Sequence, residues 1–216
     1  MTISQQLKYV FFDLDGTLTP RPSWEQITEL LGGDPEKHLE IFHDYIAGKY
    51  NTADATVEIM KLFTTNGPVT KAKLQEISKM IPFRPDAVEI CQYLAKKYTL
   101  GLATSSLDLY AQSKAQELGI TEIFVDVTTD WNEKNEMITF HYSKDWNNWK
   151  IKRLEKFLQE KNLSKEEIAF VGDGHNDVAI FKALPYTFAI ATADNSDIIH
   201  EAKVQIKSLS ELKNYL

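Results

Sequence analysis

Short apolar runs that end in small or acidic residues alternate with helical patterns along much of this chain. The runs lie at 9–12, 100–103, 168–171 and 187–190, with a weaker one at 123–127. Between them, apolar side chains recur every three or four positions, as in a helix expected from Pro85 and another over 150–161. Strands alternating with helices favour parallel pairing, and such sheets bind ligands beyond the carboxyl ends of their strands. We therefore predict an α/β fold with a doubly wound parallel sheet.

Residues 20–82 show helical patterns only. Four apolar stripes, typical of buried helix faces, are separated by glycine-containing breaks; the second stripe consists of Leu39, Phe42 and Ile46. Because this segment directly follows the first strand, we predict a helical cap domain over 20–82 and an α/β core domain over 1–19 and 83–216. Its position favours a lid over the end of that strand rather than a helical decoration that only adds core.

A further pattern follows the strand at 123–127. Residues 128–145 contain two arms around a polar turn at 132–136, and in the second arm Met137, Thr139 and His141 alternate with Ile138, Phe140 and Tyr142. This alternation predicts a β-hairpin.

Composition limits the partners and the compartment. The chain has 24 Lys plus Arg against 31 Asp plus Glu, a net charge of -7, and no basic stripe, so nucleic acid is disfavoured as a partner. No apolar run approaches the roughly 20 residues of a membrane span, and the first residues lack the features of a signal peptide. The one cysteine, Cys91, is expected to be a core thiol. We expect a cytoplasmic protein without a membrane partner, and its oligomeric state stays open.

Polar and acidic side chains follow the predicted strands or begin helices at four places. These are DLDGT at 13–17, ATSS at 103–106, Lys150, and VGDGHND at 171–177. Their carboxylates, Asp13, Asp15, Asp173 and Asp177, would repel one another in one cleft unless some are protonated or a hard cation is bound. An oxygen-only set without a Cys/His cluster favours Mg²⁺. A phosphate substrate would also need the ammonium of Lys150 and donors from Thr104.

These four segments, in this order and spacing, resemble the haloacid dehalogenase superfamily, most closely its phosphoserine phosphatase-like branch with a helical (C1) cap. The resemblance covers essentially the whole chain, and it implies an aspartyl-phosphate route. Asp13 would be the nucleophile, and Asp15 the general acid and then the base. The implied metal residues are Asp13, Asp15 through its backbone carbonyl, Asp173, and Asp177 in support; the implied phosphate-binding residues are Thr104, Ser105, Lys150 and Asn176.

Several neighbours of these motifs receive a structural interpretation. His175 is expected to be a solvated loop residue, and Ser105 and Ser106 are expected to be the first residues of a helix, near the phosphate. Trp146 and Trp149 are expected to anchor the helix that carries Lys150 rather than to bind a cofactor.

The sequence departs from phosphoserine phosphatases at two positions. Alignment to the family places Pro22 where an acidic residue grips the substrate ammonium, and Ile59 where an arginine grips its carboxylate. Losing two charge-assisted contacts lowers discrimination for phosphoserine, at roughly 1.5 to 3 kcal/mol each. We therefore predict a small phosphomonoester other than phosphoserine as substrate. Four residues near the expected mouth are open to either a leaving-group or a structural role: Arg21, Trp24, Lys49 and Arg84.

Three functions remain distinct at this point. The leading hypothesis is a Mg²⁺-dependent phosphomonoesterase acting on a small phosphorylated metabolite. A phosphotransferase or phosphomutase would instead return the phosphoryl group to a second alcohol. A signalling module would keep a long-lived aspartyl-phosphate on Asp13, which Asp15 and the predicted cap argue against, because an acid/base group beside the acyl phosphate promotes its hydrolysis.

Overall fold

The computed structural model describes residues 6–143, 145–192 and 195–216. The first five residues of the predicted core domain and position 144 of the predicted hairpin lie outside the described residues. The strands are β1 (Tyr9–Phe12), β2 (Thr99–Leu107), β3 (Glu122–Trp131), β4 (Met137–His141), β5 (Ile168–Gly172), β6 (Tyr186–Ile190) and β7 (Val204–Ile206). They form one sheet in the order β4-β3-β2-β1-β5-β6-β7, and every neighbouring pair is parallel except β3 and β4.

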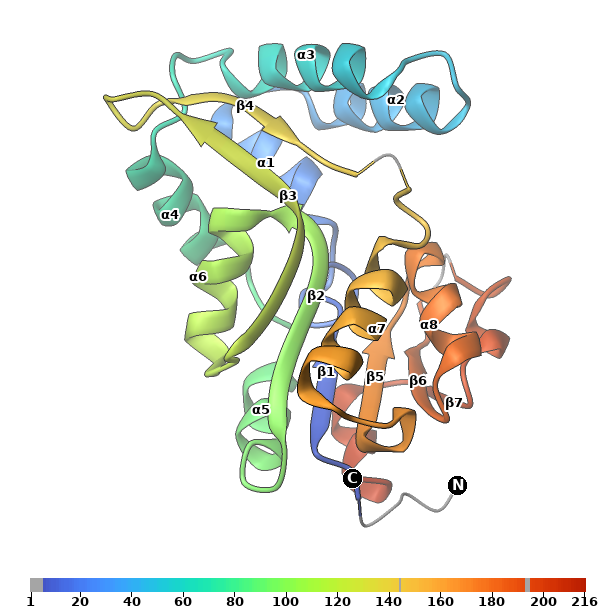
Figure 1. Cartoon of the computed structure of the whole chain (residues 1–216). Helices are drawn as coiled ribbons and strands as arrows, with labels where there is room; N and C mark the ends of the chain where they lie inside the picture. Colours follow the sequence, from blue (N-terminus) through green and yellow to red (C-terminus); the bar gives the residue numbers. More distant parts are fainter. Residues whose placement is uncertain (1–5, 144, 193–194) are drawn as a thin grey trace.

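Helices cover both faces of this sheet (Figure 1). The α-helices are α1 (Ser23–Leu31), α2 (Pro35–Ile46), α3 (Thr52–Phe63), α4 (Lys71–Met80), α5 (Ala87–Leu94), α6 (Asp108–Leu118), α7 (Trp149–Lys161) and α8 (Val178–Ala183). Short 3-10 helices are η1 (Lys165–Glu167), η2 (His175–Asp177), η3 (Ile199–Glu201) and η4 (Leu209–Asn214).

The central strand β1 is buried on both faces. Val10 and Phe12 join the apolar cluster that includes residues of α5 and α6, whereas Phe11, between them, joins the cluster that includes Phe157 of α7. Successive side chains of a strand point to opposite faces, so one short apolar strand can contribute to both clusters. The predicted doubly wound α/β fold is confirmed.

The helices expected within 20–82 are present as α1 to α4. In Figure 1, α2 and α3 lie at the top with β4, beyond the end of the parallel strands. Helix α3 contacts α2 and β4, and α4 contacts α6. The division of the chain into a core and a cap domain at positions 19 and 83 stays a prediction.

Strand β3 differs from the expectation. The predicted strand at 123–127 and the first arm of the predicted hairpin form one continuous strand. Its first half pairs in parallel with β2, and its second half pairs antiparallel with β4. No Gly or Pro interrupts residues 122–131, so the backbone remains extended while its neighbour changes. Strand β7, three residues long, was not predicted because so short a run carries little periodic signal.

The apolar stripe of α2 also differs from the usual pattern. Leu39, Phe42 and Ile46 are 39%, 44% and 47% exposed, whereas His38 and Ile41 are buried. The helix therefore packs against its neighbours through a face that contains a histidine, and its more apolar face is left uncovered. This arrangement bears on the site described below.

Two other expectations concern single features. Cys91 is fully buried on α5, and burial raises the pKa of its thiol to about 12, so the predicted core thiol is confirmed. Across the described residues, no helix combines the length and the hydropathy that a membrane crossing requires.

Candidate active site

Three neighbouring strand ends and the first turn of a helix meet at one edge of the sheet. Asp13 follows β1, Thr104 lies on β2 and Asp173 follows β5. The register aligns these ends, because Phe12 pairs with Leu102 on one side and Val171 on the other. Lys150, in the first turn of α7, is buried with its Nζ 3.0 Å from Asp13 Oδ1.

Three carboxylates crowd around this lysine. Oxygen atoms of Asp13, Asp173 and Asp177 all lie within 4.8 Å of one another. Burial raises the pKa of Asp13 well above its ordinary value; Lys150 opposes this, and the neighbouring carboxylates add to it. Burial and Asp177 likewise raise the pKa of Asp173. Burial disfavours the charged form of Lys150, but the carboxylates of Asp13 and Asp177 outweigh burial and raise the pKa of Lys150, so the ammonium is retained.

Asp177 anchors the GDGHND loop. One of its oxygens accepts a hydrogen bond from Lys150 Nζ at 2.6 Å, and the other accepts from the backbone N–H groups of Asp173 and Gly174, each at 3.0 Å. These contacts fix the position of the Asp173 backbone. Asn195, which sequence reasoning missed, donates to the carbonyl of Asp173 at 2.9 Å and fixes it from the other side.

Asp15 lies apart from the three crowded carboxylates. Its carboxylate accepts hydrogen bonds from three hydroxyl groups: Ser23 Oγ at 2.6 Å, Ser106 Oγ at 2.9 Å and Thr19 Oγ1 at 3.4 Å. Burial raises the pKa of Asp15, and the bonds from Ser23 and Ser106 oppose that rise. The sequence pattern did not single out Ser23; it is the first residue of α1, and only the packing of α1 brings it to Asp15.

The ATSS segment is a strand end rather than a helix start. Ser105 and Ser106 belong to β2, at a point where its pairing with β3 shifts, and α6 begins only at Asp108. The expectation of a helix start was therefore wrong; the strand continues because β3 is long enough to pair with it. Thr104 Oγ1 lies 2.8 Å from Ser106 Oγ, which links the expected phosphate-binding residue to Asp15.

Two tryptophans hold Ser105. Trp24 Nε1 donates to its carbonyl at 3.0 Å, and Trp149 Nε1 donates to its hydroxyl at 2.8 Å. Trp149 thus ties α7, and with it Lys150, to the end of β2, as expected of an anchoring residue. Trp146, the other tryptophan expected to anchor α7, lines the cavity described below.

The DLDGT loop is held by Arg84. The guanidinium donates to the carbonyl of Gly16 from Nη2 at 2.6 Å and from Nε at 3.2 Å. Thr17 Oγ1 donates to Asp173 Oδ1 at 2.6 Å, joining this loop to the one after β5. Arg84 is therefore a structural contact of the loop. Lys49 pairs with Asp44 at 2.7 Å on the surface, so neither cation is directed to a leaving group.

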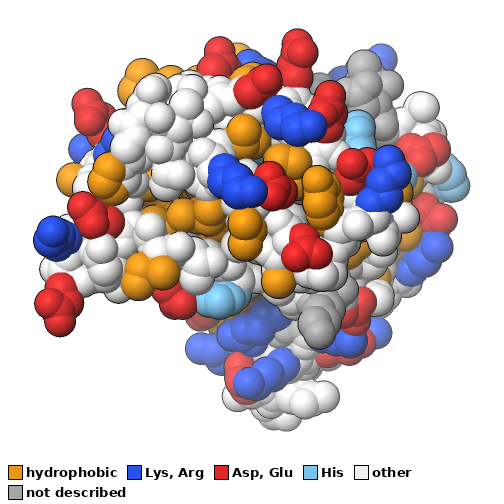
Figure 2. Space-filling view, turned by 90° about the horizontal axis from the view of Figure 1, so that it is seen from above, with side chains coloured by type: hydrophobic (Ala, Val, Ile, Leu, Met, Phe, Trp, Pro, Cys, Tyr) orange, Lys and Arg blue, Asp and Glu red, His pale blue; other side chains and the backbone are white. Residues whose placement is uncertain are grey.

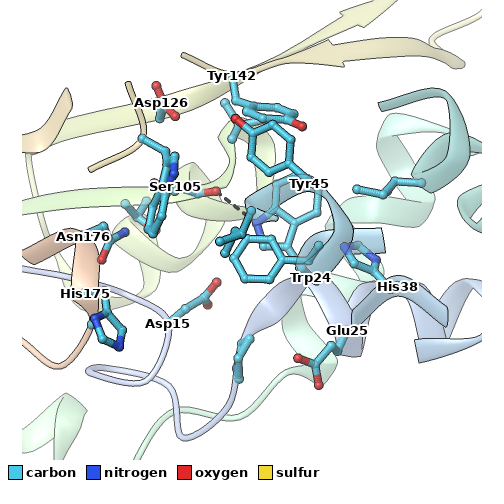
Figure 3. A pocket seen from close by; sticks show the side chains of 18 of the residues that line it. Asp15, Trp24, Glu25, His38, Tyr45, Ser105, Asp126, Tyr142, His175 and Asn176 are labelled. Carbon is cyan, nitrogen blue, oxygen red and sulfur yellow. Dashed lines mark hydrogen bonds between the residues drawn. The ribbon is translucent and has the colours of Figure 1, made fainter. Parts of the chain in front are cut away.

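A cavity of about 540 Å³ opens above these groups. In Figure 3, Asp15, His175 and Asn176 lie on one side of it, with Tyr45 and Tyr142 on another and Trp24 between them. Asp13, Thr104 and Ser105 line the same cavity, as do Pro22, Trp24 and Ile59. The side chain of His175 is 60% exposed, as expected of a solvated residue, and lies 3.6 Å from Asp197 Oδ2, but the residue begins the 3-10 helix η2 instead of lying in a loop.

The residues present fit a hard divalent cation. The crowded donors are all carboxylate oxygens, and only two of the three carboxylates pair with the one ammonium, so a cation would relieve the excess negative charge. Asp13 and Asp173 are the carboxylates placed to hold it, while the bonds of Asp177 to Lys150 and to the loop backbone give it a supporting position.

Comparison with known proteins identifies the class. Residues 7–184 match the profile of the haloacid dehalogenase-like hydrolases, and the chain belongs to this family of enzymes. Within it, the chain is similar to phosphoserine phosphatases. It is 25% identical over 215 residues to the phosphoserine phosphatase of Campylobacter jejuni subsp. doylei (strain ATCC BAA-1458 / RM4099 / 269.97), covering 95% of this chain and 98% of that one.

Solved structures show the same fold. A substrate-bound phosphoserine phosphatase has a TM-score of 0.78 at 20% identity, covering 99% of this chain and 100% of the other. A phospho-aspartyl intermediate analogue of phosphoserine phosphatase has a TM-score of 0.77 at 20% identity, and the match covers 97% of this chain and 99% of the other. A HAD family hydrolase from Salmonella enterica serovar Typhi has a TM-score of 0.80 at 17% identity, covering 97% of this chain and 72% of that one.

Proposed function

We propose that this protein is a Mg²⁺-dependent phosphomonoesterase that works through an aspartyl-phosphate on Asp13. The observation that carries the proposal is the cluster of Asp13, Asp173 and Asp177, two of which pair with the buried Lys150, at the base of a cavity, with Asp15 beside it. The relatives named phosphoserine phosphatases support the same chemistry. For this chain we propose a small phosphate ester other than phosphoserine, because Pro22 and Ile59 present no charge to the cavity.

The residues can carry both halves of a hydrolysis. An oxygen of Asp13 attacks phosphorus, the bond from phosphorus to the ester oxygen breaks, and the leaving oxygen takes a proton from Asp15. Asp15 then removes a proton from water, whose oxygen attacks phosphorus and releases the Asp13 carboxylate and inorganic phosphate. Lys150 and donors from Thr104, Ser105 and Asn176 would hold the phosphoryl oxygens. Bound Mg²⁺ would supply positive charge that offsets the charge of the carboxylates and phosphate.

The arrangement around Asp15 suits its two roles. The hydroxyl groups of Ser23 and Ser106 fix its carboxylate in one orientation, and Ser106 also contacts Thr104. A proton donor held this way stays aligned with the leaving oxygen, which is the main protein contribution to a general acid. Ser23 belongs to α1, so the position of this helix also determines the orientation of the acid.

The test is phosphate release from a panel of amino-acid, sugar, alkyl and nucleotide phosphates, with Mg²⁺ and with chelator. We expect metal-dependent release from at least one ester and its abolition by Asp13→Asn. The matched control is Asp130→Asn, which changes an exposed aspartate paired with His141. Full activity of Asp13→Asn would remove the covalent route. Transfer to added alcohols in preference to water would favour the phosphotransferase, and a stable phosphorylated protein without turnover would favour the signalling module.

A further inference from the structure

The uncovered stripe of α2 forms one wall of the cavity. Leu39, Phe42 and Ile46 all line it, and their exposure of 39%, 44% and 47% is the highest among the apolar residues of that helix. Large apolar side chains left exposed at successive turns lose the stability that burial gives, unless something covers them. Figure 2 looks down on this end of the molecule and shows hydrophobic side chains across the middle of the face, with charged ones among and around them.

Aromatic rings line the cavity where α2 meets the β3–β4 hairpin. Tyr45 of α2 meets Tyr142 edge to face, with ring centroids 5.5 Å apart. The ring of Phe140, on β4, stacks on that of Tyr142 with centroids 6.1 Å apart. Figure 3 shows Tyr45 and Tyr142 together above Trp24. With about 540 Å³, the cavity has room for much more than a phosphoryl group, and its size falls within the range of roughly 300 to 1,000 Å³ typical of small-molecule sites.

The fixed charges that line this cavity are negative. None of the described residues that line it is Lys or Arg, and beyond the Asp13 and Asp15 end its carboxylates are those of Glu25 and Asp126. His175 also lines it, but at the catalytic end and 3.6 Å from Asp197 Oδ2, so a leaving group that carries a carboxylate would find repulsion and no unpaired cation at the α2 wall. Asp126 already accepts the backbone N–H of Ser143 at 3.2 Å, and burial raises the pKa of Asp126, so it is poorly suited to hold a cation either.

The histidine at the apolar end is held by a neighbouring helix. His38 Nδ1 lies 2.6 Å from Thr28 Oγ1, within the contact between α1 and α2, and burial lowers the pKa of His38 to about 4, so the ring is neutral. The wall opposite the catalytic carboxylates therefore presents mainly alkyl and aromatic surface.

We propose that the substrate is a phosphate ester of an uncharged apolar alcohol, aryl or branched alkyl, whose apolar part lies against Leu39, Phe42 and Ile46. This inference rests on the proposed function and names the substrate class for the same site. The ester end meets Asp13 and Asp15, and the apolar end covers the exposed stripe of α2.

The first experiment compares kcat/KM for esters of alcohols with similar acidity. Benzyl phosphate and 3-methylbutyl phosphate should exceed ethyl phosphate by about 10- to 100-fold, because the added carbons enter an apolar pocket. They should exceed phosphoserine and phosphocholine by at least as much. A kcat/KM for phosphoserine or phosphocholine equal to or above that of the apolar esters overturns the proposal and leaves the phosphatase function standing.

The variant test uses two exposed apolar residues of neighbouring helices. Phe42→Ser should lower kcat/KM for benzyl phosphate by about 10-fold more than kcat/KM for ethyl phosphate, whose short chain makes little contact with this wall. Val57→Ser is the control, since Val57 is 54% exposed on α3 and does not line the cavity. Equal effects of both variants on benzyl phosphate would overturn the assignment of the α2 wall.

A binding measurement separates this inference from the proposed function. Calorimetry with benzylphosphonate and methylphosphonate reports on the pocket without turnover. We expect benzylphosphonate to bind about 10-fold more tightly in the wild type, and the difference to disappear in Phe42→Ser. If no ester is hydrolysed but this preference is found, the phosphatase proposal fails and the apolar site stands. Equal affinities for the two phosphonates overturn the apolar site.

Discussion

At the scale of single residues, Gly16 shows how closely the two acidic loops approach. Its φ of +79° lies in the left-handed region, and a Cβ placed on it would come within 2.0 Å of Asp173 Oδ2. The DLDGT loop thus needs glycine both for its backbone conformation and for the space that the Asp173 carboxylate occupies. The glycine is as much a part of the site as the carboxylates are.

Replacing Gly16 by alanine should therefore abolish most activity. We expect Gly16→Ala to lower phosphate release by about 100-fold, because a displacement of the order of an ångström in the reacting groups costs that much. The control is Gly48→Ala, since Gly48 has a φ of +75° with nothing within 4 Å of the added Cβ. Both variants should lose roughly 1 to 2 kcal/mol of unfolding free energy in urea, but only Gly16→Ala should lose activity. Retained activity in Gly16→Ala would show that Asp173 can move freely.

At the scale of secondary-structure elements, the contact between α1 and α2 depends on a neutral histidine. His38 is buried against Thr28, and burial lowers the pKa of His38 to about 4. At a pH between the ordinary histidine pKa near 6.5 and the pKa of His38 in the folded state, the unfolded chain binds a proton that the folded chain does not. The neutral His38 therefore contributes fully to the free energy of unfolding above pH 6.5. Below that pH the contribution falls by about 1.4 kcal/mol per pH unit.

Urea unfolding across this pH range tests that linkage. The wild type should lose on the order of 3 kcal/mol between pH 7 and pH 4 through this group. His38→Gln should be less stable at pH 7 and lose less on acidification, whereas His43→Gln, an exposed change on the same helix, should follow the wild type. An unchanged pH profile in His38→Gln would mean that other groups cause the acid sensitivity.

The same helix shows where sequence patterns are limited. Periodicity identified α2 and its apolar stripe, but a stripe reports only that a face is apolar, not what covers it. His38 and Ile41 make the packed face, and Leu39 and Phe42 face the cavity, because the neighbours of α2 lie on the histidine side. In β3 the local pattern correctly predicted an extended backbone for each half. That the two halves form one strand follows only from their pairing with β2 and β4, and no local pattern encodes that pairing.

At the scale of the whole molecule, the sheet explains why much of the site was predictable. Asp13, Asp173 and Lys150 come from segments far apart in sequence, yet parallel strands end at one edge, so strand-end motifs converge there. Ser23 and Asn195, and the contact of Ser106 with Asp15, could not be found in this way. Their contacts with Asp15 and with the backbone of Asp173 depend on how α1, the end of β2 and the last loop pack, and serine and asparagine are common in such places without a role.

The crowding of carboxylates between the loops after β1 and β5 also predicts a stability effect of the metal. Mg²⁺ that binds only the folded chain at about 100 times its dissociation constant adds about 2.7 kcal/mol to the free energy of unfolding. For a chain of 216 residues this raises the unfolding midpoint by about 5 to 10 °C. Differential scanning calorimetry with Mg²⁺ and with chelator measures this shift without any substrate.

Asp173→Asn separates charge relief from metal binding. Asparagine keeps an oxygen that can accept the hydrogen bond from Thr17, but it removes one of the crowded charges. In chelator the variant should therefore unfold at a temperature equal to or above that of the wild type, because buried like charges repel. With Mg²⁺ it should gain less than half of the wild-type shift, while Asp130→Asn should gain all of it. An equal shift in Asp173→Asn would place the metal elsewhere on the protein and remove its role at this edge of the sheet.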